Sequence, residues 1–260
     1  MANAIYNWVQ RVWYGGARSG MLLLPLSGLY WLLIRTRAAL YRAGFFRVRQ
    51  SGAPVVVIGN ITAGGTGKSP TAIWLVEQLR SRGYRPGIIS RGYGGSRAGT
   101  SMRVDADSDA AIVGDEPVML ARRTGGPVTV DSNRLRAAGM LIDDGVDVIV
   151  ADDGLQHSRL GREFEICVVD GERLLGNGYL LPAGPLRESA SRLQSVDAVL
   201  VNGGEFAGGI RFDLVADSAR RLNGSLTKGL KEFRETTVHA IAAIGNPQRF
   251  FELLRGFGIQ

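Results

Sequence analysis

The stretch "VVVIGNITAGGTGKSP", residues 55–70, joins a short apolar run to a glycine-rich turn that carries a lysine. A run of valine and isoleucine that stops at such a turn predicts a strand buried on both faces. A helix is expected to follow from about residue 68 to residue 80. Gly67, Lys68 and Ser69 fit the end of the phosphate-binding loop G-x-x-x-x-G-K-[ST], but Thr62 stands at its first glycine position.

The loop keeps the residue types that phosphate binding needs. Glycines let backbone N–H groups point at phosphate oxygens, Lys68 can reach the β- and γ-phosphates, and Ser69 can bind Mg²⁺. The alternative is a glycine-rich turn without a ligand. The strand, the Gly-Lys-Ser ending and the following helix favour a nucleoside triphosphate. The predicted cradle comprises Thr62, Ala63, Gly64, Gly65, Thr66, Gly67, Lys68 and Ser69.

A second apolar run, "VDVIVADDGLQH" (146–157), ends in Asp152 and Asp153. The end of a buried strand is where a phosphate-binding loop needs an acid for its metal. Paired aspartates also occur as a plain turn signal, but beside the loop they favour a metal site. The chain has no N-K-x-D stretch, which favours ATP over GTP, and no G-x-S-x-G nucleophile turn.

The rest of the chain alternates between the two kinds of element. Strands are predicted at 54–60, 85–90, 127–130, 146–153, 165–170, 197–202 and 237–245, and helices at 68–80, 115–123, 132–144 and 246–258. Asp115 is predicted as the N-cap of its helix. Strand–helix alternation predicts an α/β fold with a doubly wound, mostly parallel sheet like that of P-loop NTPases. Its site should lie at the carboxyl ends of the strands.

Two further stretches are candidates for substrate contacts. "SRGYGG" (90–95) follows a predicted strand, and its Arg91 can meet a phosphate; the alternative is a turn with a surface arginine. "GNGYLLPAGPLRE" (176–188) is rich in glycine and proline and ends in Arg187 and Glu188. Arg187 suits a phosphate or sugar, and the alternative is a solvated loop.

Charge is unevenly distributed along the 260 residues. The net charge of +7 lies in residues 1–50, which hold seven arginines and no acid, while the remainder balances. This basic segment is also the most apolar, which argues against a nucleic-acid partner. One cysteine excludes an internal disulfide, and with two histidines a zinc site is not expected.

The apolar run "MLLLPLSGLYWLLI" (21–34) lies within this basic segment. As a helix, the uncharged stretch between Arg18 and Arg35 would span about 24 Å, short of the ~30 Å hydrocarbon core. A signal peptide fits badly, because arginines follow the run without a small-x-small site. We expect a helix in the interface of an anionic membrane. The alternative is a core helix.

Five motifs together resemble the tetraacyldisaccharide 4'-kinase family of Gram-negative bacteria: "GNITAGGTGKSP", "SRGYGG", "GDEP", "DDGLQH" and "LLPAGPLRE". The resemblance runs from the N-terminal apolar segment to residue 260, and the family shares the deviant loop. It implies transfer of the ATP γ-phosphoryl group, with Mg²⁺, to the 4'-hydroxyl of tetraacyldisaccharide 1-phosphate. It also implies an enzyme on the cytoplasmic face of the inner membrane, peripheral or monotopic.

The resemblance assigns roles to single residues. Asp115 would be the acceptor base, Glu116 would join the aspartate pair around the metal, and Gln156 would lie beside them on the substrate side. The family normally continues to a Phe-x-Asp-His motif, which is absent here. We therefore expect a membrane segment (1–50), a kinase core (51–236) and the start of a second α/β domain (237–260). The apolar face of residues 246–258 should then be under-covered.

Two alternatives to an active lipid kinase stay open at this point. One is a membrane-attached nucleotide-binding protein with little or no transfer, which the absent motif would explain. The other is a partition-type ATPase, which accounts for the loop but not for "LLPAGPLRE".

Overall fold

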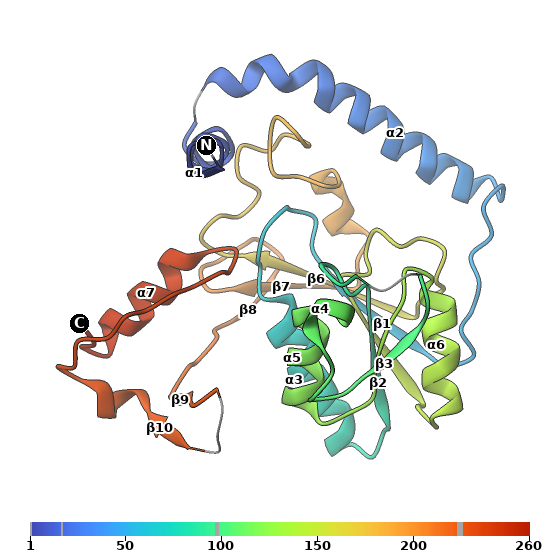
Figure 1. Ribbon diagram of the computed structural model, residues 1–260. Coiled ribbons are helices and arrows are strands. Elements are labelled where there is room, and N and C mark those ends of the chain that lie inside the picture. The colour runs from blue at the N-terminus through green and yellow to red at the C-terminus, as the bar shows by residue number, and fades with distance from the viewer. Residues whose placement is uncertain (1, 17, 97–98, 223–225) are drawn as a thin grey trace.

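The computed structural model describes residues 2–16, 18–96, 99–222 and 226–260. An eight-stranded sheet in the order β3-β4-β2-β5-β1-β6-β7-β8 organises the molecule (Figure 1). All neighbours pair in parallel except β3, which runs antiparallel to β4 at one edge. The strands are β1 (Val55–Gly59), β2 (Pro86–Ser90), β3 (Met102–Val104), β4 (Val128–Val130), β5 (Val148–Asp152), β6 (Phe164–Asp170), β7 (Ala198–Asn202) and β8 (Ile210–Phe212).

Helices cover both faces of this sheet, so the predicted doubly wound α/β fold is confirmed. On one face, α3 (Lys68–Ser81) and α5 (Asp115–Thr124) pack their buried side chains against the strands, with the short α4 (Ala110–Val113) beside them. On the other face lie α6 (Arg134–Asp143), the segment 155–186 and η2 (Ala190–Gln194). Strand β1 is buried between β5 and β6, which explains its unbroken apolar sequence.

The register of the central strands brings the predicted motifs together. Ile58 of β1 is level with Asp152 of β5, so the glycine-rich loop and the aspartate pair leave the sheet side by side. Strand β2 is also adjacent to β5 and leads into the loop that carries Arg91. The carboxyl ends of three neighbouring parallel strands therefore form one edge, as expected for this fold.

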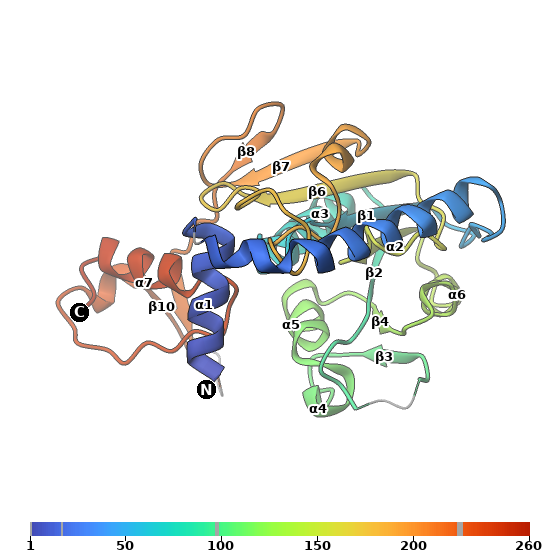
Figure 2. The ribbon, with the colours of Figure 1, turned by 90° about the horizontal axis from the view of Figure 1, so that it is seen from above.

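The described part of the N-terminal segment lies outside the sheet and forms α1 (Ala2–Tyr14), η1 (Arg18–Leu23) and α2 (Leu24–Arg42). Figures 1 and 2 show α2 crossing over the edge where the strands end. Ser27 and Tyr30 donate hydrogen bonds to the backbone oxygens of Leu180 and Arg187, at 2.8 and 3.0 Å. Pro25 lies in the first turn of α2, where proline is tolerated, and the helix continues past the apolar 21–34 stretch to Arg42.

Helix α2 is not the core helix of the alternative interpretation. Only Ser27 of α2 is buried, and the leucines on its outer side are exposed. By length and composition alone, the helical stretch Ser19–Arg42 is long and apolar enough to cross a membrane, which is weak evidence for a span.

The C-terminal part lies beside the main sheet (Figure 1). It contains an antiparallel pair, β9 (Ser218–Arg220) and β10 (Thr227–Gly229), followed by η3 (Leu230–Phe233) and α7 (Pro247–Gly256). Helix α7 was predicted correctly, but the strand predicted at 237–245 is wrong. Val238 donates a hydrogen bond to the Gln260 carbonyl, and Gly245 lies against the glycine-rich loop, so the segment joins no sheet.

The apolar face of α7 is half-buried: Phe250, Leu253, Leu254 and Phe257 are all partly covered. Phe250 and Leu253 line a cavity next to the glycine-rich loop. The sequence analysis expected this face of α7 to be under-covered. In this structure it instead lies against the loop at the end of β1.

Candidate active site

Two cavities meet at the start of α3. The larger, of about 720 Å³, lies under α2 and is lined by Tyr30, Arg37, Lys68, Ser90, Arg91, Tyr93, Glu116, Ser132, Arg134, Asp153, Gln156, His157, Leu181 and Arg187. The smaller, of about 420 Å³, lies between the glycine-rich loop and the C-terminal part. Lys68 and Glu116 line both. We call them the large cavity and the loop cavity.

The glycine-rich loop has the backbone that a phosphate cradle needs. Gly64 and Gly67 have φ angles of 119° and 102°, a region that favours glycine. A Cβ on Gly67 would also lie 2.7 Å from Nδ2 of Asn202. Helix α3 starts at Lys68, so its free N–H groups and its dipole point at the loop cavity.

Thr62 is accommodated because the first part of the loop is extended rather than tightly turned. The Ala63 N–H donates to the Pro185 carbonyl at 2.7 Å, and the Arg187 N–H donates to the Ile61 carbonyl at 2.7 Å. Thr62 forms an antiparallel bridge with Leu186. A β-branched residue fits such pairing well. Thr62 can therefore replace the usual first glycine because this part of the loop pairs with the "LLPAGPLRE" stretch.

Lys68 is held between two side chains. Its Nζ donates to Oδ1 of Asn60 at 3.3 Å and lies 3.5 Å from Oδ1 of Asp153. Asn60 is buried, and its Nδ2 donates to the carbonyls of Thr62 and Gly64 at 2.8 and 3.3 Å. Asn60 therefore fixes both the lysine and the loop. The sequence analysis missed it because an asparagine after a strand is usually a turn residue.

The two aspartates of the pair have different surroundings. Asp152 is buried, and neither of its carboxylate oxygens has a hydrogen-bond partner among the residues that the structure describes. Burial, and then the negative charge of Glu116, raise the pKa of Asp152 to about 7. Ser69 donates its hydroxyl to Oε1 of Glu116 at 2.5 Å. Ser69, Glu116 and Asp152 are thus gathered at the junction of the cavities.

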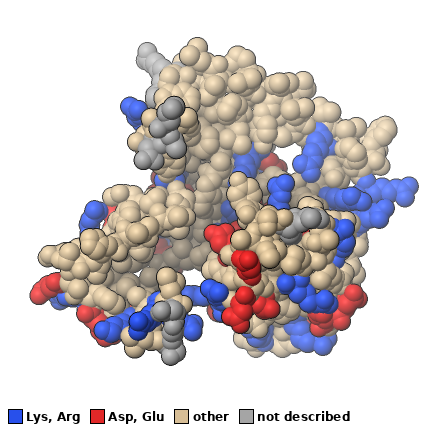
Figure 3. Space-filling view, in the orientation of Figure 1, with Lys and Arg blue, Asp and Glu red and all other residues tan. Residues whose placement is uncertain are grey.

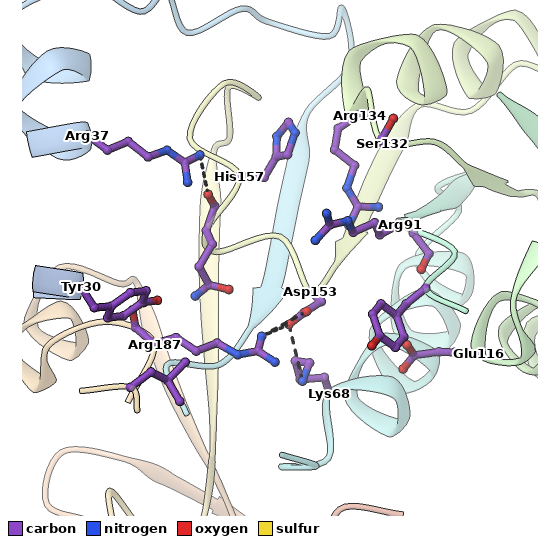
Figure 4. A pocket seen from close by; sticks show the side chains of 14 residues that line it. Tyr30, Arg37, Lys68, Arg91, Glu116, Ser132, Arg134, Asp153, His157 and Arg187 are labelled. Carbon is purple, nitrogen blue, oxygen red and sulfur yellow. Dashed lines mark hydrogen bonds and ion pairs between the residues drawn. The ribbon is translucent and has the colours of Figure 1, made fainter. Parts of the chain in front are cut away.

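Asp153 instead sits between two cations. It lies 3.3 Å from Arg187 as well as close to Lys68. Burial alone would raise its pKa, but these two charges hold the pKa of Asp153 below its ordinary value. Its φ of 48° is unusual for a residue other than glycine, although Asp tolerates that region. Figure 4 shows Asp153 between Lys68 and Arg187.

This donor set fits Mg²⁺. A buried carboxylate without a partner, a second carboxylate and a hydroxyl are oxygen ligands of the kind that Mg²⁺ prefers. Within the described ranges, no group of three or more His, Cys, Asp or Glu side chains forms a ready metal cage. Mg²⁺ in phosphoryl-transfer sites usually takes one or two carboxylates and completes its shell with phosphates and water, so the fit does not require such a cage.

The predicted substrate residues line or border the large cavity. Gln156 donates from Nε2 to the Asn60 carbonyl at 3.0 Å and to Oε1 of Glu188 at 2.7 Å. Arg91 and Arg187 line the cavity directly. Arg134 and His157 are among the lining residues that the sequence analysis did not single out. Arg134 is buried and donates to the Asp152 carbonyl at 2.9 Å, and burial lowers the pKa of His157 to about 4.

Asp115 is not the N-cap of α5, so that prediction is wrong. Gly114 takes the cap position with φ 93° and ψ 150°, and Asp115 is the first helical residue. Its side chain is exposed and lines neither cavity, whereas the next residue, Glu116, lines both. A carboxylate in the first turn is favoured by the helix dipole.

The C-terminal part covers the loop cavity. Gly245 packs directly on Gly65, and its carbonyl accepts a 2.7 Å hydrogen bond from Arg173. Arg249 donates to the Asn202 carbonyl at 3.2 Å. Leu214, Ile244, Phe250 and Leu253 give this cavity an apolar wall opposite the loop. The cavity therefore combines a phosphate-binding end with an apolar end.

A glycine-rich loop with its lysine, an aspartate pair and a mostly parallel sheet define a P-loop fold, with a second cavity beside the loop. Residues 19–260 match the family model of tetraacyldisaccharide-1-P 4'-kinase, and the chain belongs to this family of lipid A precursor kinases. The resemblance seen in the sequence is thereby confirmed.

Relatives of known name agree with this family. The tetraacyldisaccharide 4'-kinase of Methylobacillus flagellatus is 48% identical over 263 residues, which cover 100% of this chain and 78% of the relative. That of Nitrosococcus oceani is 49% identical over 252 residues, covering 95% and 73%. The crystal structure of LpxK from Aquifex aeolicus in complex with ATP superposes with a TM-score of 0.78 at 27% identity, covering 93% of this chain and 79% of that one.

Proposed function

We propose that the protein transfers the γ-phosphoryl group of ATP to the 4'-hydroxyl of tetraacyldisaccharide 1-phosphate, giving ADP and the 1,4'-bisphosphate. The observation that carries the proposal is the meeting of the two cavities at Lys68 and Glu116. A nucleotide in the loop cavity would present its terminal phosphate to an acceptor in the large cavity. The ATP complex of the Aquifex aeolicus relative supports ATP as the donor.

In this proposal the chain supplies position and charge. The loop from Thr62 to Ser69 forms the cradle, in which the N–H groups after Ala63 would hold the phosphates, and Lys68 would neutralise charge on the transferred group. Ser69, Glu116 and Asp152 would hold Mg²⁺, which supplies further neutralisation when bound. Asp153 keeps Lys68 and Arg187 aligned. The side chains of Arg91, Gln156, Arg187 and Glu188 would position the acceptor.

The experiment is an assay with labelled ATP and the disaccharide 1-phosphate in detergent micelles. The expected result is a labelled lipid product, with ADP release that depends on the lipid. ATP binding without transfer would favour the nucleotide-binding alternative. ADP release without the lipid would favour a partition-type ATPase.

We assign the role of acceptor base to Asp115 by analogy with the family, although its exposed side chain lines neither cavity in this structure. Asp115→Asn should lower turnover at least ~100-fold while ATP affinity stays the same, because Asp115 does not line the loop cavity. The measurements are turnover and nucleotide titration. Asp109→Asn is the control, since Asp109 caps the neighbouring α4 and asparagine also caps. Normal turnover of Asp115→Asn would remove the residue from the mechanism.

The acyl chains of the proposed substrate lie in a membrane, and we infer that α1, η1 and α2 bring the enzyme to the cytoplasmic face of the inner membrane. Figure 3 shows the surface over these elements as largely uncharged, with basic residues at its flanks. Leu22, Leu29 and Leu33 are 84%, 55% and 62% exposed. Apolar burial and attraction to anionic lipids would act together there.

Replacing Leu29 and Leu33 together with glutamate should release the protein from anionic vesicles, because both charges would enter the apolar layer. Vesicle sedimentation measures the effect, and the double change Val215→Glu and Leu222→Glu, at exposed positions of the C-terminal part, is the matched control. High salt should weaken binding of the unchanged protein without abolishing it. Equal release by both double variants would show that net charge, not α2, decides binding.

The cover over the loop cavity should contribute to nucleotide affinity. In Gly245→Ala the new methyl group would overlap the backbone nitrogen of Gly65 and push the C-terminal part outward. We expect ATP affinity to fall about tenfold, measured by titration. Gly256→Ala is the control, because a Cβ there meets nothing within 4 Å. Unchanged affinity in Gly245→Ala would mean that the cover does not contact the nucleotide.

A further inference from the structure

Arg37 extends from the membrane-facing helix α2 into the large cavity. Its Nη2 donates to the Gln156 carbonyl at 3.0 Å, and its Cζ lies 5.9 Å from the centre of the Tyr41 ring. Tyr30, two turns earlier on the same helix, donates to the Arg187 carbonyl. Helix α2 therefore does more than present an apolar face: it carries one cation into the space where the acceptor is expected.

The two ends of the large cavity differ in charge. Figure 4 shows Arg37 at the opposite end from Lys68, while Glu116 and Asp153 lie towards the Lys68 end. These are the only carboxylates among the described residues that line the cavity. His157 is neutral at pH 7 because burial lowers its pKa. The Arg37 end is therefore positive.

Arg37 has no ion pair with a carboxylate among the described residues. Its hydrogen-bond partner is the Gln156 carbonyl, which occupies one of the five guanidinium N–H donors. Glu188 borders this region, but it accepts from Gln156 and lies 3.4 Å from Arg192. Arg187, by contrast, is paired with Asp153. A cation at the mouth of a cavity, with donors left over, is suited to an anionic ligand.

We propose that Arg37 binds the phosphate at the far end of the acceptor from the reacting hydroxyl. This inference rests on the proposed function, in which that group is the 1-phosphate. The cavity would then orient the disaccharide: its anion lies at Arg37, and its neutral 4'-hydroxyl lies at Lys68 and the transferred phosphoryl group. Because α2 lies at the membrane, Arg37 would meet the 1-phosphate at the level of the lipid headgroups.

The test compares two acceptors in the same micelles: the tetraacylated disaccharide with and without its 1-phosphate. Arg37→Ala should lower kcat/KM at least tenfold for the phosphorylated acceptor, chiefly through KM, a loss typical of a charge-assisted hydrogen-bonded pair. For the acceptor without the phosphate, Arg37→Ala and the unchanged protein should agree within about twofold. Arg37→Lys should recover part of the preference, because it keeps the charge but loses the planar fork.

Arg35→Ala is the matched control. Arg35 lies on the same helix and carries the same charge, but it sits over the Trp31 ring at 5.6 Å and does not line the cavity. It should change the kinetics of both acceptors alike, if at all. Equal selectivity loss in Arg35→Ala, or an equal loss on both acceptors in Arg37→Ala, would overturn the inference. A wild-type protein that phosphorylates neither acceptor would instead overturn the proposed function, and the inference with it.

Discussion

Replacing Lys68 with alanine should lower phosphoryl transfer at least ~100-fold, the scale of losing one charge-stabilising group at a transition state. Among the described residues, two line both cavities: Lys68 and Glu116. Lys68 is therefore the one cation among them that can contact the bound groups in both. Its ammonium group is held by Asn60 and Asp153 and so is already in place when the substrates bind. Initial rates with both substrates measure the effect.

The thermal midpoint of Lys68→Ala should stay close to that of the unchanged protein. Asp153 keeps Arg187 as a partner, and Asn60 keeps its two hydrogen bonds to the loop backbone. Lys231→Ala is the control, since Lys231 is an exposed lysine in η3, remote in sequence from the loop. Near-normal transfer by Lys68→Ala would contradict the assignment of the phosphate-binding loop.

The central sheet could be predicted from the sequence because buried parallel strands have a distinctive composition. Strands β1 and β5 are near-continuous runs of valine, isoleucine and alanine, and the second half of β6 is an apolar, buried run of the same kind. The edge strands β3 and β8 were missed. Each has three residues with an arginine in the middle, and pairs on one side only. Such strands are set by the neighbouring strand rather than by their own sequence.

The strand predicted at 237–245 shows the limit of the same reasoning. "TVHAIAAIG" has the composition of a buried strand, yet Ile241 is 91% exposed. Composition reports how well a segment would fit a sheet, not whether a sheet edge is within reach. Here the chain has already left β8, and the segment leads to α7 and the cover of the loop cavity.

For the site, sequence motifs predicted the residues that follow the strands. They did not predict the residues whose side chains hold those site residues in place. The loop, the aspartate pair and Arg91 were found because each directly follows a predicted buried strand, and Arg187 because it ends a glycine- and proline-rich stretch. Arg134 and Arg37 were missed as site residues, since each acts through contacts with segments more distant in sequence, and Asn60 because an asparagine after a strand is usually a turn residue. Only the fold brings α2, α6 and the end of β1 to the same cavity.

Asp152→Asn should have the second large effect on activity. Asp152→Asn and Asp153→Asn should also change the stability of the metal-free protein in opposite directions. If Asp152 holds Mg²⁺, its loss should lower metal-dependent transfer by ~100-fold or more. The variant should also lose the thermal stabilisation that ATP with Mg²⁺ gives to the unchanged protein. Activity and thermal shift at several Mg²⁺ concentrations are the measurements.

Without metal, Asp152 should make the protein less stable as the pH rises. Its folded pKa of about 7 lies above the ordinary 3.8, so the folded state binds the proton more tightly than the unfolded state. The stabilisation is complete below about pH 4 and is lost as the pH rises to about 7. Asp152→Asn should remove this dependence and so raise the stability of the metal-free protein at pH 7. Unfolding in denaturant with a chelator present measures it.

Asp153→Asn is the matched control, because the same change is made one residue away. The charges of Lys68 and Arg187 hold the pKa of Asp153 below its ordinary value, so its ionised form stabilises the fold above about pH 4, and that contribution is lost as the pH falls. Asp153→Asn should therefore lower stability at pH 7, where Asp152→Asn raises it. If both variants change the metal-free stability in the same direction, the two aspartates do not have the separate roles assigned to them: one for the metal, the other for the two cations.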